Sequence, residues 1–398
     1  MSEGPTDAAT PVVSSFYDRF PYPGDPLQDG PPPGYNWRWC VPCAFAACTG
    51  AVPDLPDPLR ILDAGCGTGV STDYLALLNP GAEILAIDIS PGTLDVARER
   101  LRRSGAGERA RVRVEQRSLL DLGGEGPFDY INSVGVLHHL SDPQAGLQSL
   151  SGVLRPGGLL HLFLYADGGR WEIHRTQAAL ALIGAGPDAE GLRLGRTLLA
   201  TLPEANRLRR HHEQRWALDT AADANFADMY LHPQESSYTL ERLFRFIEAA
   251  DLRFAGFSNP EVWDPARLLE GELLERARSL PAPEQWRLVE ALDPDISHFE
   301  FFLSKGALTP IDWGSDEALL AASGHRNPCL WGWPSTSLLD PDLRPLAISL
   351  EELAYMELLE AAPPGTPLGA LAPQQPPAER AALVRRLLKR RVLLLQKD

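Results

Sequence analysis

The 398-residue sequence has few cysteines, no long apolar run and a deficit of basic residues, and each shortage excludes a class of protein. The five cysteines are an odd number spread over a long chain, which argues against a disulfide framework and favours a reducing cytoplasm. No stretch of about 18 apolar residues is present, so we expect no membrane-spanning segment. The N-terminus lacks the basic and apolar regions of a signal peptide. Lys and Arg number 37 against 53 Asp and Glu, and the resulting net charge of −16 disfavours non-specific binding to nucleic acid.

Apolar runs typical of strands alternate with helical patterns over residues 59–165. Such alternation indicates βαβ units around a parallel sheet. The first five predicted strands are residues 59–63, 84–89, 112–114, 128–134 and 159–165. Two more strands are predicted at 252–257 and 297–304, and helical patterns cover 239–250 and 265–292. Residues 170–235 are rich in Leu, Ala and Arg without a strand-like run, so we expect a helical insertion there.

Three parts are predicted along the chain. Residues 1–58 are punctuated by proline, and we expect a mostly irregular segment with one helix near 35–48. Residues 59–305 form the main domain. Residues 310–398 form a small α+β module that we predict to be winged-helix-like, with a capping box at Ser349-x-x-Glu352, three short helices and a final strand. Its last helix carries a basic face made of Arg385, Arg386, Lys389, Arg390 and Arg391, for which a solvated helix face is the simpler interpretation.

A glycine-rich turn follows the first predicted strand. Glycines at 65, 67 and 69 have the spacing G-x-G-x-G, which differs from the dinucleotide-binding pattern G-x-G-x-x-G. Asp63 precedes the first glycine by two positions, where an acidic side chain suits a cationic, amino-acid-bearing ligand better than a pyrophosphate. Asp88 ends the second strand, and an acidic residue at that place can bind both hydroxyls of a ribose.

Four motifs in order resemble one known family. The glycine turn, Asp88, the segment from Phe128-Asp129 to His138-His139-Leu140, and Leu154-Arg155-Pro156-Gly157-Gly158 together resemble the class I S-adenosylmethionine-dependent methyltransferases. The resemblance is specific over residues 59–165, and it extends less closely from there to about residue 305. It implies a Rossmann-like seven-stranded, mostly parallel sheet whose last strand is antiparallel, S-adenosyl-L-methionine as cofactor, and S-adenosyl-L-homocysteine as product.

The resemblance also implies a cofactor site. The glycine loop would hold the methionine part, Asp88 the ribose and Ile89 the adenine, while the end of the fourth strand would pass beside the sulfonium. Relatives often carry an acidic residue after the third strand, where this chain has Ser118, and the main chain of Leu119 can serve instead. The predicted cofactor-binding residues are Asp63, Ala64, Gly65, Gly67, Thr68, Gly69, Asp88, Ile89, Ser118, Leu119, Ser133 and Val134.

Methyl transfer from a sulfonium is an in-line displacement that requires a base only if the acceptor carries a proton. His139 is the predicted base, with a structural histidine at a strand–helix turn as the alternative. Tyr17 is the second predicted catalytic residue, because the aromatic N-terminal segment is expected to close over the cofactor or, alternatively, to pack outside the sheet. The predicted substrate-binding residues are Tyr22, His138, Tyr230, His232 and Tyr238.

The expected activity is methyl transfer to a small-molecule or peptide acceptor. The first alternative is a protein side-chain methyltransferase with a C-terminal recognition module, and the second is a regulatory cofactor-binding protein with weak catalysis. Cys40-Val41-Pro42-Cys43 imitates a thioredoxin redox motif, but no strand precedes it, and a zinc site would need a second pair of ligands. We therefore expect no metal.

Overall fold

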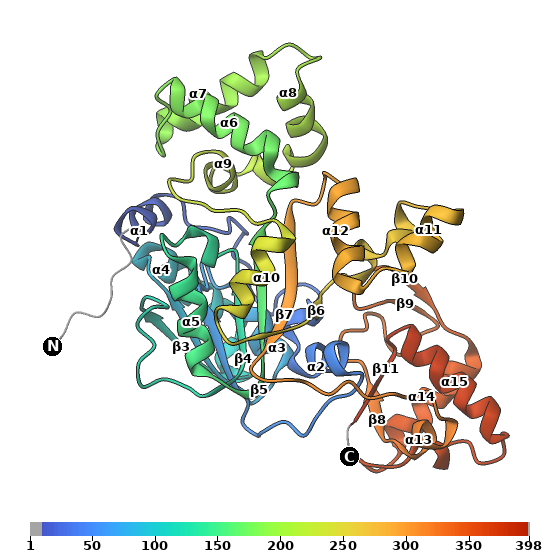
Figure 1. Ribbon diagram of the computed structural model, residues 1–398. Helices are drawn as coiled ribbons and strands as arrows, with labels where there is room; N and C mark the ends of the chain where they lie inside the picture. Colours follow the sequence, from blue (N-terminus) through green and yellow to red (C-terminus); the bar gives the residue numbers. More distant parts are fainter. Residues whose placement is uncertain (1–9, 397–398) are drawn as a thin grey trace.

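The computed structural model describes residues 10–396, so the first nine residues of the predicted N-terminal segment lie outside the described residues. Figure 1 shows a central sheet covered by helices, with the helical insertion above it and the C-terminal module beside its lower edge. No helix among residues 10–396 is long and apolar enough to cross a membrane.

Seven strands form the central sheet in the order β3-β2-β1-β4-β5-β7-β6. Their bounds are β1 Arg60–Ala64, β2 Glu83–Asp88, β3 Arg111–Gln116, β4 Phe128–Val134, β5 Leu154–Tyr165, β6 Arg253–Phe257 and β7 His298–Ser304. Strands β1 to β5 pair in parallel, whereas β7 runs antiparallel to both β5 and β6. This confirms the predicted α/β fold, in which the seven-stranded sheet is mostly parallel and its last strand in sequence is antiparallel.

Helices cover both faces of the sheet because alternate strand residues are apolar on both sides. Leu62 of β1 belongs to the core under helices α5 and α10, while its neighbour Ile61 belongs to the core under α2 and α3. The helices of this domain are α1 Thr10–Arg19, α2 Val41–Thr49, α3 Val70–Leu78, α4 Pro91–Ser104, α5 Pro143–Val153, α10 Leu240–Glu248, α11 Gly271–Arg278 and α12 Ala282–Leu292.

The insertion is helical, and it packs against the N-terminal segment. It contains α6 Trp171–Leu182, α7 Ala189–Thr201, α8 Arg207–His211 and α9 Asp223–Tyr230. Phe16 and Phe20 belong to the same buried cluster as Ile173 of α6 and Phe226 of α9. Helix α1 is therefore held between the insertion and the main domain.

The C-terminal module has its own buried core but also shares one with the main domain. Its elements are α13 Asp316–Ala321, β8 Gly324–Arg326, β9 Ser337–Leu339, β10 Pro345–Ala347, α14 Leu350–Ala361, α15 Pro377–Lys389 and β11 Leu393–Leu395. Strand β8 pairs with β11 and β9 with β10, both antiparallel. The capping box of Ser349 and Glu352 at the start of α14 is confirmed. Cys329 and Leu394 of the module pack in the core that also contains Trp37 and Phe45.

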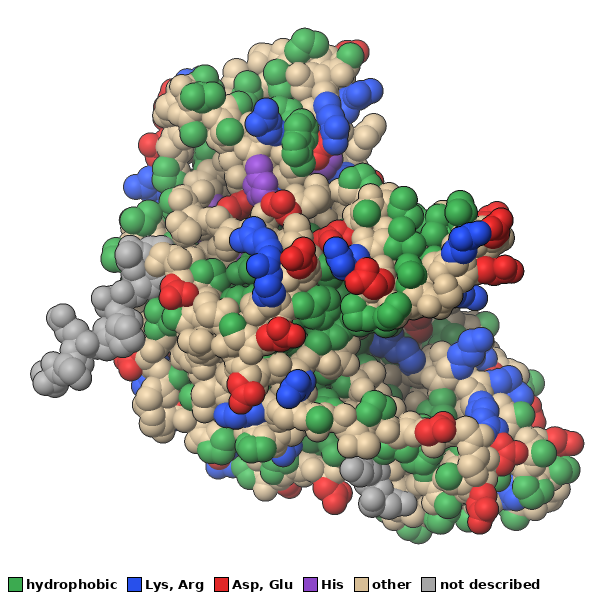
Figure 2. Space-filling model, viewed as in Figure 1, with side chains coloured by type: hydrophobic (Ala, Val, Ile, Leu, Met, Phe, Trp, Pro, Cys, Tyr) green, Lys and Arg blue, Asp and Glu red, His purple; other side chains and the backbone are tan. Residues whose placement is uncertain are grey.

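Most of the basic face near the end of α15 is paired with carboxylates. Arg385 pairs with Asp316, Arg386 with Glu351 and Glu352, Arg390 with Glu352, and Arg391 with Asp342. In Figure 2, basic and acidic side chains are interspersed over this part of the visible face. Phosphate groups would have to compete with these internal partners.

Two predicted regions differ in the structure. Residues 10–19 form helix α1, although the N-terminal segment was expected to be mostly irregular with a single helix near 35–48. Val13 and Phe16 on one side of α1 are buried, so tertiary packing stabilises a short helix that has little strength of its own. The predicted helical stretch 265–292 is interrupted between α11 and α12, where Pro281 precedes the second helix.

Candidate active site

The glycine turn joins β1 to α3 through backbone angles that favour glycine. Gly65 and Gly67 have φ values of 79° and 54°. A Cβ on Gly67 would lie 2.5 Å from the carbonyl oxygen of Tyr22, so only a hydrogen at this position lets the N-terminal segment approach. The amide of Gly67 donates to Asp88 Oδ2 at 3.0 Å, which ties the turn to the end of β2.

Asp63 stabilises the glycine turn through buried hydrogen bonds and does not line a cavity. Its Oδ2 accepts hydrogen bonds from Ser71 and Thr72 at 2.7 and 2.6 Å, and its Oδ1 accepts one from Asn132 at 2.8 Å. The side chain is 1% exposed, and burial raises the pKa of this carboxyl above its usual range. Any contact between Asp63 and a ligand in the cavity is therefore indirect.

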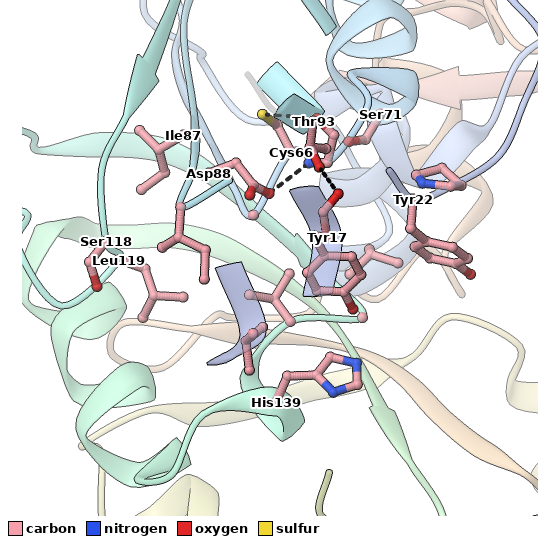
Figure 3. Close-up of a pocket in the computed structure, with 18 of the residues that line it drawn as sticks. Tyr17, Tyr22, Cys66, Ser71, Ile87, Asp88, Thr93, Ser118, Leu119 and His139 are labelled. Carbon is pink, nitrogen blue, oxygen red and sulfur yellow. Dashed lines mark hydrogen bonds between the residues drawn. The ribbon is translucent and has the colours of Figure 1, made fainter. Parts of the chain in front are cut away.

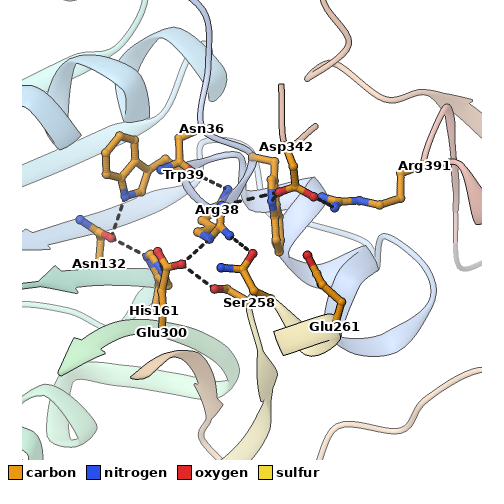
Figure 4. A network of polar contacts seen from close by, with 12 residues as sticks. Asn36, Arg38, Trp39, Asn132, His161, Ser258, Glu261, Glu300, Asp342 and Arg391 are labelled. Carbon is orange, nitrogen blue, oxygen red and sulfur yellow. Dashed lines mark hydrogen bonds and ion pairs between the residues drawn. The ribbon is translucent and has the colours of Figure 1, made fainter. Parts of the chain in front are cut away.

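A network of polar contacts continues from Asn132 across the sheet (Figure 4). Asn132 Oδ1 accepts hydrogen bonds from Trp39 Nε1 at 3.0 Å and from His161 Nδ1 at 2.9 Å. His161 Nε2 lies 3.2 Å from Glu300, which pairs with Arg38 at 2.7 Å. The segment before β1 is thus tied to the strand ends that carry the glycine turn.

A cavity of about 230 Å³ lies at the carboxyl ends of the parallel strands (Figure 3). Open α/β sheets bind ligands at this edge. Asp88 and Ile89 line it from the end of β2, Ser118 and Leu119 from the segment after β3, and Gly135 from the end of β4. A Cβ on Gly135 would meet no atom within 4 Å, so the cavity is open beside the end of β4.

The N-terminal segment closes the cavity. Tyr22 and Pro23 place their carbonyl oxygens 3.1 and 2.8 Å from the amide and hydroxyl of Thr68. Asp18 of α1 accepts hydrogen bonds from the Ser90 hydroxyl and the Gly92 amide at 2.6 and 3.1 Å. A carboxylate at this place also interacts favourably with the amino end of helix α4.

Four polar side chains gather at one end of this cavity. Tyr17 donates to Asp228 at 2.9 Å, and its ring centroid lies 6.3 Å from that of His139. The rings of His139 and His232 are 3.8 Å apart, and one nitrogen of each lies within 4.8 Å of a carboxylate oxygen of Asp228. Tyr17 and His139 line the cavity, while Asp228 and His232 lie behind them.

Hydrogen bonds fix the protons on the two histidines. His139 Nδ1 lies 2.8 Å from the carbonyl oxygen of Gln234, which can only accept, so the lone pair of the neutral ring is on Nε2. His232 Nδ1 accepts from the Gln234 amide at 3.1 Å, so its proton is on Nε2. That buried Nε2 has no partner among the described residues.

Burial governs the protonation of this cluster. It lowers the pKa of His139 below the usual range, against the opposing effect of the Asp228 carboxylate, and it lowers the pKa of His232 as well. It raises the pKa of Asp228. Burial and the nearby Asp228 carboxylate together raise the pKa of the Tyr17 phenol well above its usual range. At neutral pH, His139 is therefore a neutral imidazole and Tyr17 a neutral phenol.

The structure brings most, but not all, of the predicted residues to the cavity. Among the predicted cofactor-binding residues, those that line it are Gly65, Gly67, Asp88, Ile89, Ser118, Leu119 and Val134. Ala64, Thr68, Gly69 and Ser133 support the turn and the strand ends without lining it; for example, Ser133 donates to the carbonyl oxygen of Ala64.

The predicted substrate-binding residues separate in the same way. Tyr22 lines the cavity, whereas His138 is stacked on Tyr165 with 3.7 Å between ring centroids. Tyr230 lies 3.0 Å from His212 Nδ1, and Tyr238 packs in the core over α10. The side chains of His138, Tyr230 and Tyr238 are not among the residues that line this cavity.

Sequence reasoning missed Asp228 as part of this region. Asp228 stands in the segment 228–233, which drew attention for Tyr230 and His232, but a carboxylate on a helix face carries no signal of its partner 211 positions away. Gly135 directly follows the fourth predicted strand, whose end was expected to pass beside the sulfonium, and it lines the cavity.

The comparisons with known proteins agree with this geometry. A family described as "Methyltransferase domain" matches residues 62–160, which include the glycine turn, Asp88 and His139. An uncharacterized protein of Synechococcus sp. is 50% identical over 395 residues, covering 98% of this chain and 94% of that protein. A ubiquinone biosynthesis O-methyltransferase of Xanthomonas axonopodis is 36% identical over 135 residues, covering 33% of this chain and 51% of that enzyme.

A solved structure, PKMT2 from Rickettsia typhi, has the same fold with a TM-score of 0.63 at 17% identity. The match covers 92% of this chain and 78% of that one, and the same protein has been solved in complex with AdoHcy. Residues 62–160 of this chain form a methyltransferase domain, and the chain shares its Rossmann-like fold with that solved structure. The cofactor of this kind of domain is S-adenosylmethionine.

The residues at the cavity fit such a group. Asp88 presents a carboxylate whose two oxygens each accept one backbone hydrogen bond, from Gly67 and from Ser90, and each retains a lone pair for a further donor. Ile89, Leu119 and Val134 supply apolar walls, and the open space at Gly135 leaves room beside β4.

Proposed function

We propose that this chain transfers a methyl group from S-adenosylmethionine to a small-molecule or peptide acceptor, and that His139 takes the acceptor's proton. In this proposal Asp88 accepts hydrogen bonds from the ribose hydroxyls and Ile89 contacts the adenine. Bound S-adenosylmethionine supplies the methyl group on a sulfonium that leaves as a neutral thioether. All remaining tasks belong to the protein, which positions the acceptor and excludes water.

The observation that carries the proposal is the orientation of His139. Its Nδ1 proton is held by the Gln234 carbonyl, so a free-base nitrogen remains on a ring that lines the cavity. A histidine in this state can accept the proton of a hydroxyl or an ammonium group as the methyl group arrives. Its lowered pKa keeps it unprotonated at neutral pH.

Two neighbours of His139 would support this role. The ring of His232 lies behind the lining residues with its centroid 3.8 Å from that of His139, so it would fix the orientation of His139 without touching the acceptor. The phenol of Tyr17 stands beside it, held by Asp228.

The closure of the cavity favours a small acceptor. Tyr17, Tyr22 and Pro23 line the cavity from the N-terminal segment, which is held on the glycine turn by two hydrogen bonds to Thr68. A narrow, covered cavity admits a small molecule or an extended side chain more readily than a folded surface.

One observation favours a second candidate, methylation of a protein side chain. The Asp228 carboxylate lies close to the rings of Tyr17 and His232, and an anion among aromatic rings suits a protonated amine such as a lysine side chain. A long, thin side chain of that kind could reach His139 without opening the cavity widely.

The test uses the purified full-length protein, labelled S-adenosylmethionine and a size-fractionated lysate. The proposal predicts that label appears in the small-molecule or peptide fraction and that Asp88→Ala abolishes most of it. Label confined to the protein fraction would support side-chain methylation instead. Tight cofactor binding without label in any fraction would favour a regulatory protein and contradict the proposal.

A further inference from the structure

Three buried cysteines from distant parts of the chain meet where the C-terminal module contacts the main domain. Cys40 and Cys43 lie at the start of α2, and Cys329 follows β8. Their exposed fractions are 0%, 3% and 0%, and all three are free thiols. One sulfur from each lies within 4.8 Å of the other two.

We propose that these three cysteines bind a zinc ion that fastens the C-terminal module to the segment before the main domain. The spacing Cys-x-x-Cys is common in zinc sites, and it lacked a further ligand in the sequence only because Cys329 lies 286 positions beyond Cys43. The fold supplies that ligand.

The distances suit a metal ion better than a disulfide bond. Zinc–sulfur bonds of about 2.3 Å place two sulfurs of a tetrahedral site about 3.8 Å apart. The sulfurs of Cys43 and Cys329 are 3.9 Å apart, so a zinc ion fits with a small shift. A disulfide needs sulfurs about 2.05 Å apart, which would require the two elements to move together.

Asn327 supplies a fourth donor atom at the same place. Its Oδ1 lies 3.3 Å from Cys43 Sγ and accepts a hydrogen bond from the Cys329 amide at 2.8 Å. The side chain is 1% exposed, and its Nδ2 donates to the carbonyl oxygen of Arg391 at 2.9 Å, which fixes Oδ1 toward the sulfurs. The Cys43 thiol now donates its hydrogen bond to Asn327 Oδ1. Zinc binding would release this thiol proton to the solvent, and the metal would take its place on the sulfur.

The site would stabilise a contact that the two parts already share. Cys40 directly follows Trp39, which lines the cavity, and it caps the amino end of α2. Next to this helix, the Tyr35 hydroxyl donates to the carbonyl oxygen of Asp340, and Trp37 Nε1 donates to Asp342. Zinc would therefore hold the C-terminal module against a segment that reaches the cofactor cavity.

The experiment measures metal in the full-length protein. The chain is purified under reducing conditions without a metal-affinity step, reconstituted with Zn²⁺ in the absence of oxygen, desalted and analysed by mass spectrometry of the element. We expect close to one zinc ion per chain. Replacement by Co²⁺ should give the intense sulfur-to-cobalt absorption and visible bands of a tetrahedral thiolate site, which requires no variant.

Variants locate the ion. Cys329→Ser should lose the metal and lower the midpoint of thermal unfolding of the reconstituted protein to that of the metal-free wild type. Cys48→Ser is the matched control, since Cys48 lies on the same helix but outside the cluster, and it should retain the metal. Wild-type protein that stays metal-free after reconstitution, or that instead contains a Cys43–Cys329 disulfide, would overturn the proposal. So would metal binding that depends on Cys48.

Discussion

Replacing His139 by glutamine removes a base while keeping a hydrogen-bond donor. The glutamine amide can still donate to the Gln234 carbonyl, as His139 Nδ1 does at 2.8 Å, but it cannot take up a proton. General base catalysis by a positioned side chain contributes about 10²- to 10⁴-fold. We therefore expect kcat with a hydroxyl or ammonium acceptor to fall by about 100-fold or more, with little change in cofactor affinity.

The pH dependence gives a second readout of the same residue. Burial lowers the pKa of His139, so the wild-type ring is already deprotonated at neutral pH and the rate is level there. As the pH falls through that lowered pKa, His139 becomes protonated and the rate falls about tenfold per pH unit. In His139→Gln this acidic limb is absent.

The assay is a steady-state rate measurement between pH 5 and pH 8 with the labelled acceptor fraction, at saturating cofactor, within the range where histidines titrate. His325→Gln, in the C-terminal module, is the control and should behave as wild type. A His139→Gln enzyme with the wild-type rate and the wild-type pH profile would refute the assignment of the base.

Two other substitutions test the closure of the cavity. Gly67→Val should abolish binding of S-adenosylhomocysteine in calorimetry, because its Cβ would lie 2.5 Å from the Tyr22 carbonyl oxygen at a φ of 54°. Gly81→Val is the control, since Gly81 also has a positive φ but its Cβ would have no atom within 4 Å. This control variant should bind normally. Equal binding by both variants would show that the turn does not form the cradle. Asp18→Ala should speed proteolysis near residues 20–30 several-fold, because the variant loses the hydrogen bonds from Ser90 and Gly92 that hold α1 on α4. Unchanged cleavage, with and without S-adenosylhomocysteine, would contradict the idea that the N-terminal segment closes the cavity.

The sheet was predictable because its signals are local. The first five strands are short segments that contain apolar residues and are separated by turns and helical patterns, and the glycine turn and Asp88 lie at strand ends that the sequence itself marks. Since parallel strands share one edge for their carboxyl ends, the sequence also predicts that these residues meet.

The features that sequence analysis did not predict depend on contacts between distant segments. Helix α1 is stabilised by burial of Phe16 against the insertion, more than 150 residues later, so its own pattern is weak. The partnership of Tyr17 with Asp228 and that of Cys43 with Cys329 arise from the same long-range packing. Periodicity and spacing contain no information about such pairs.

The most direct test of the account is calorimetric titration of the full-length protein with S-adenosylhomocysteine, comparing wild type with Asp88→Ala. Asp88 holds Gly67 and Ser90 in place and faces the cavity, and each hydrogen bond to a charged acceptor is worth about 1.5–3 kcal/mol. The account predicts one site per chain in the wild type and an affinity at least about tenfold weaker in a folded Asp88→Ala variant. Equal affinity in the two proteins would contradict it.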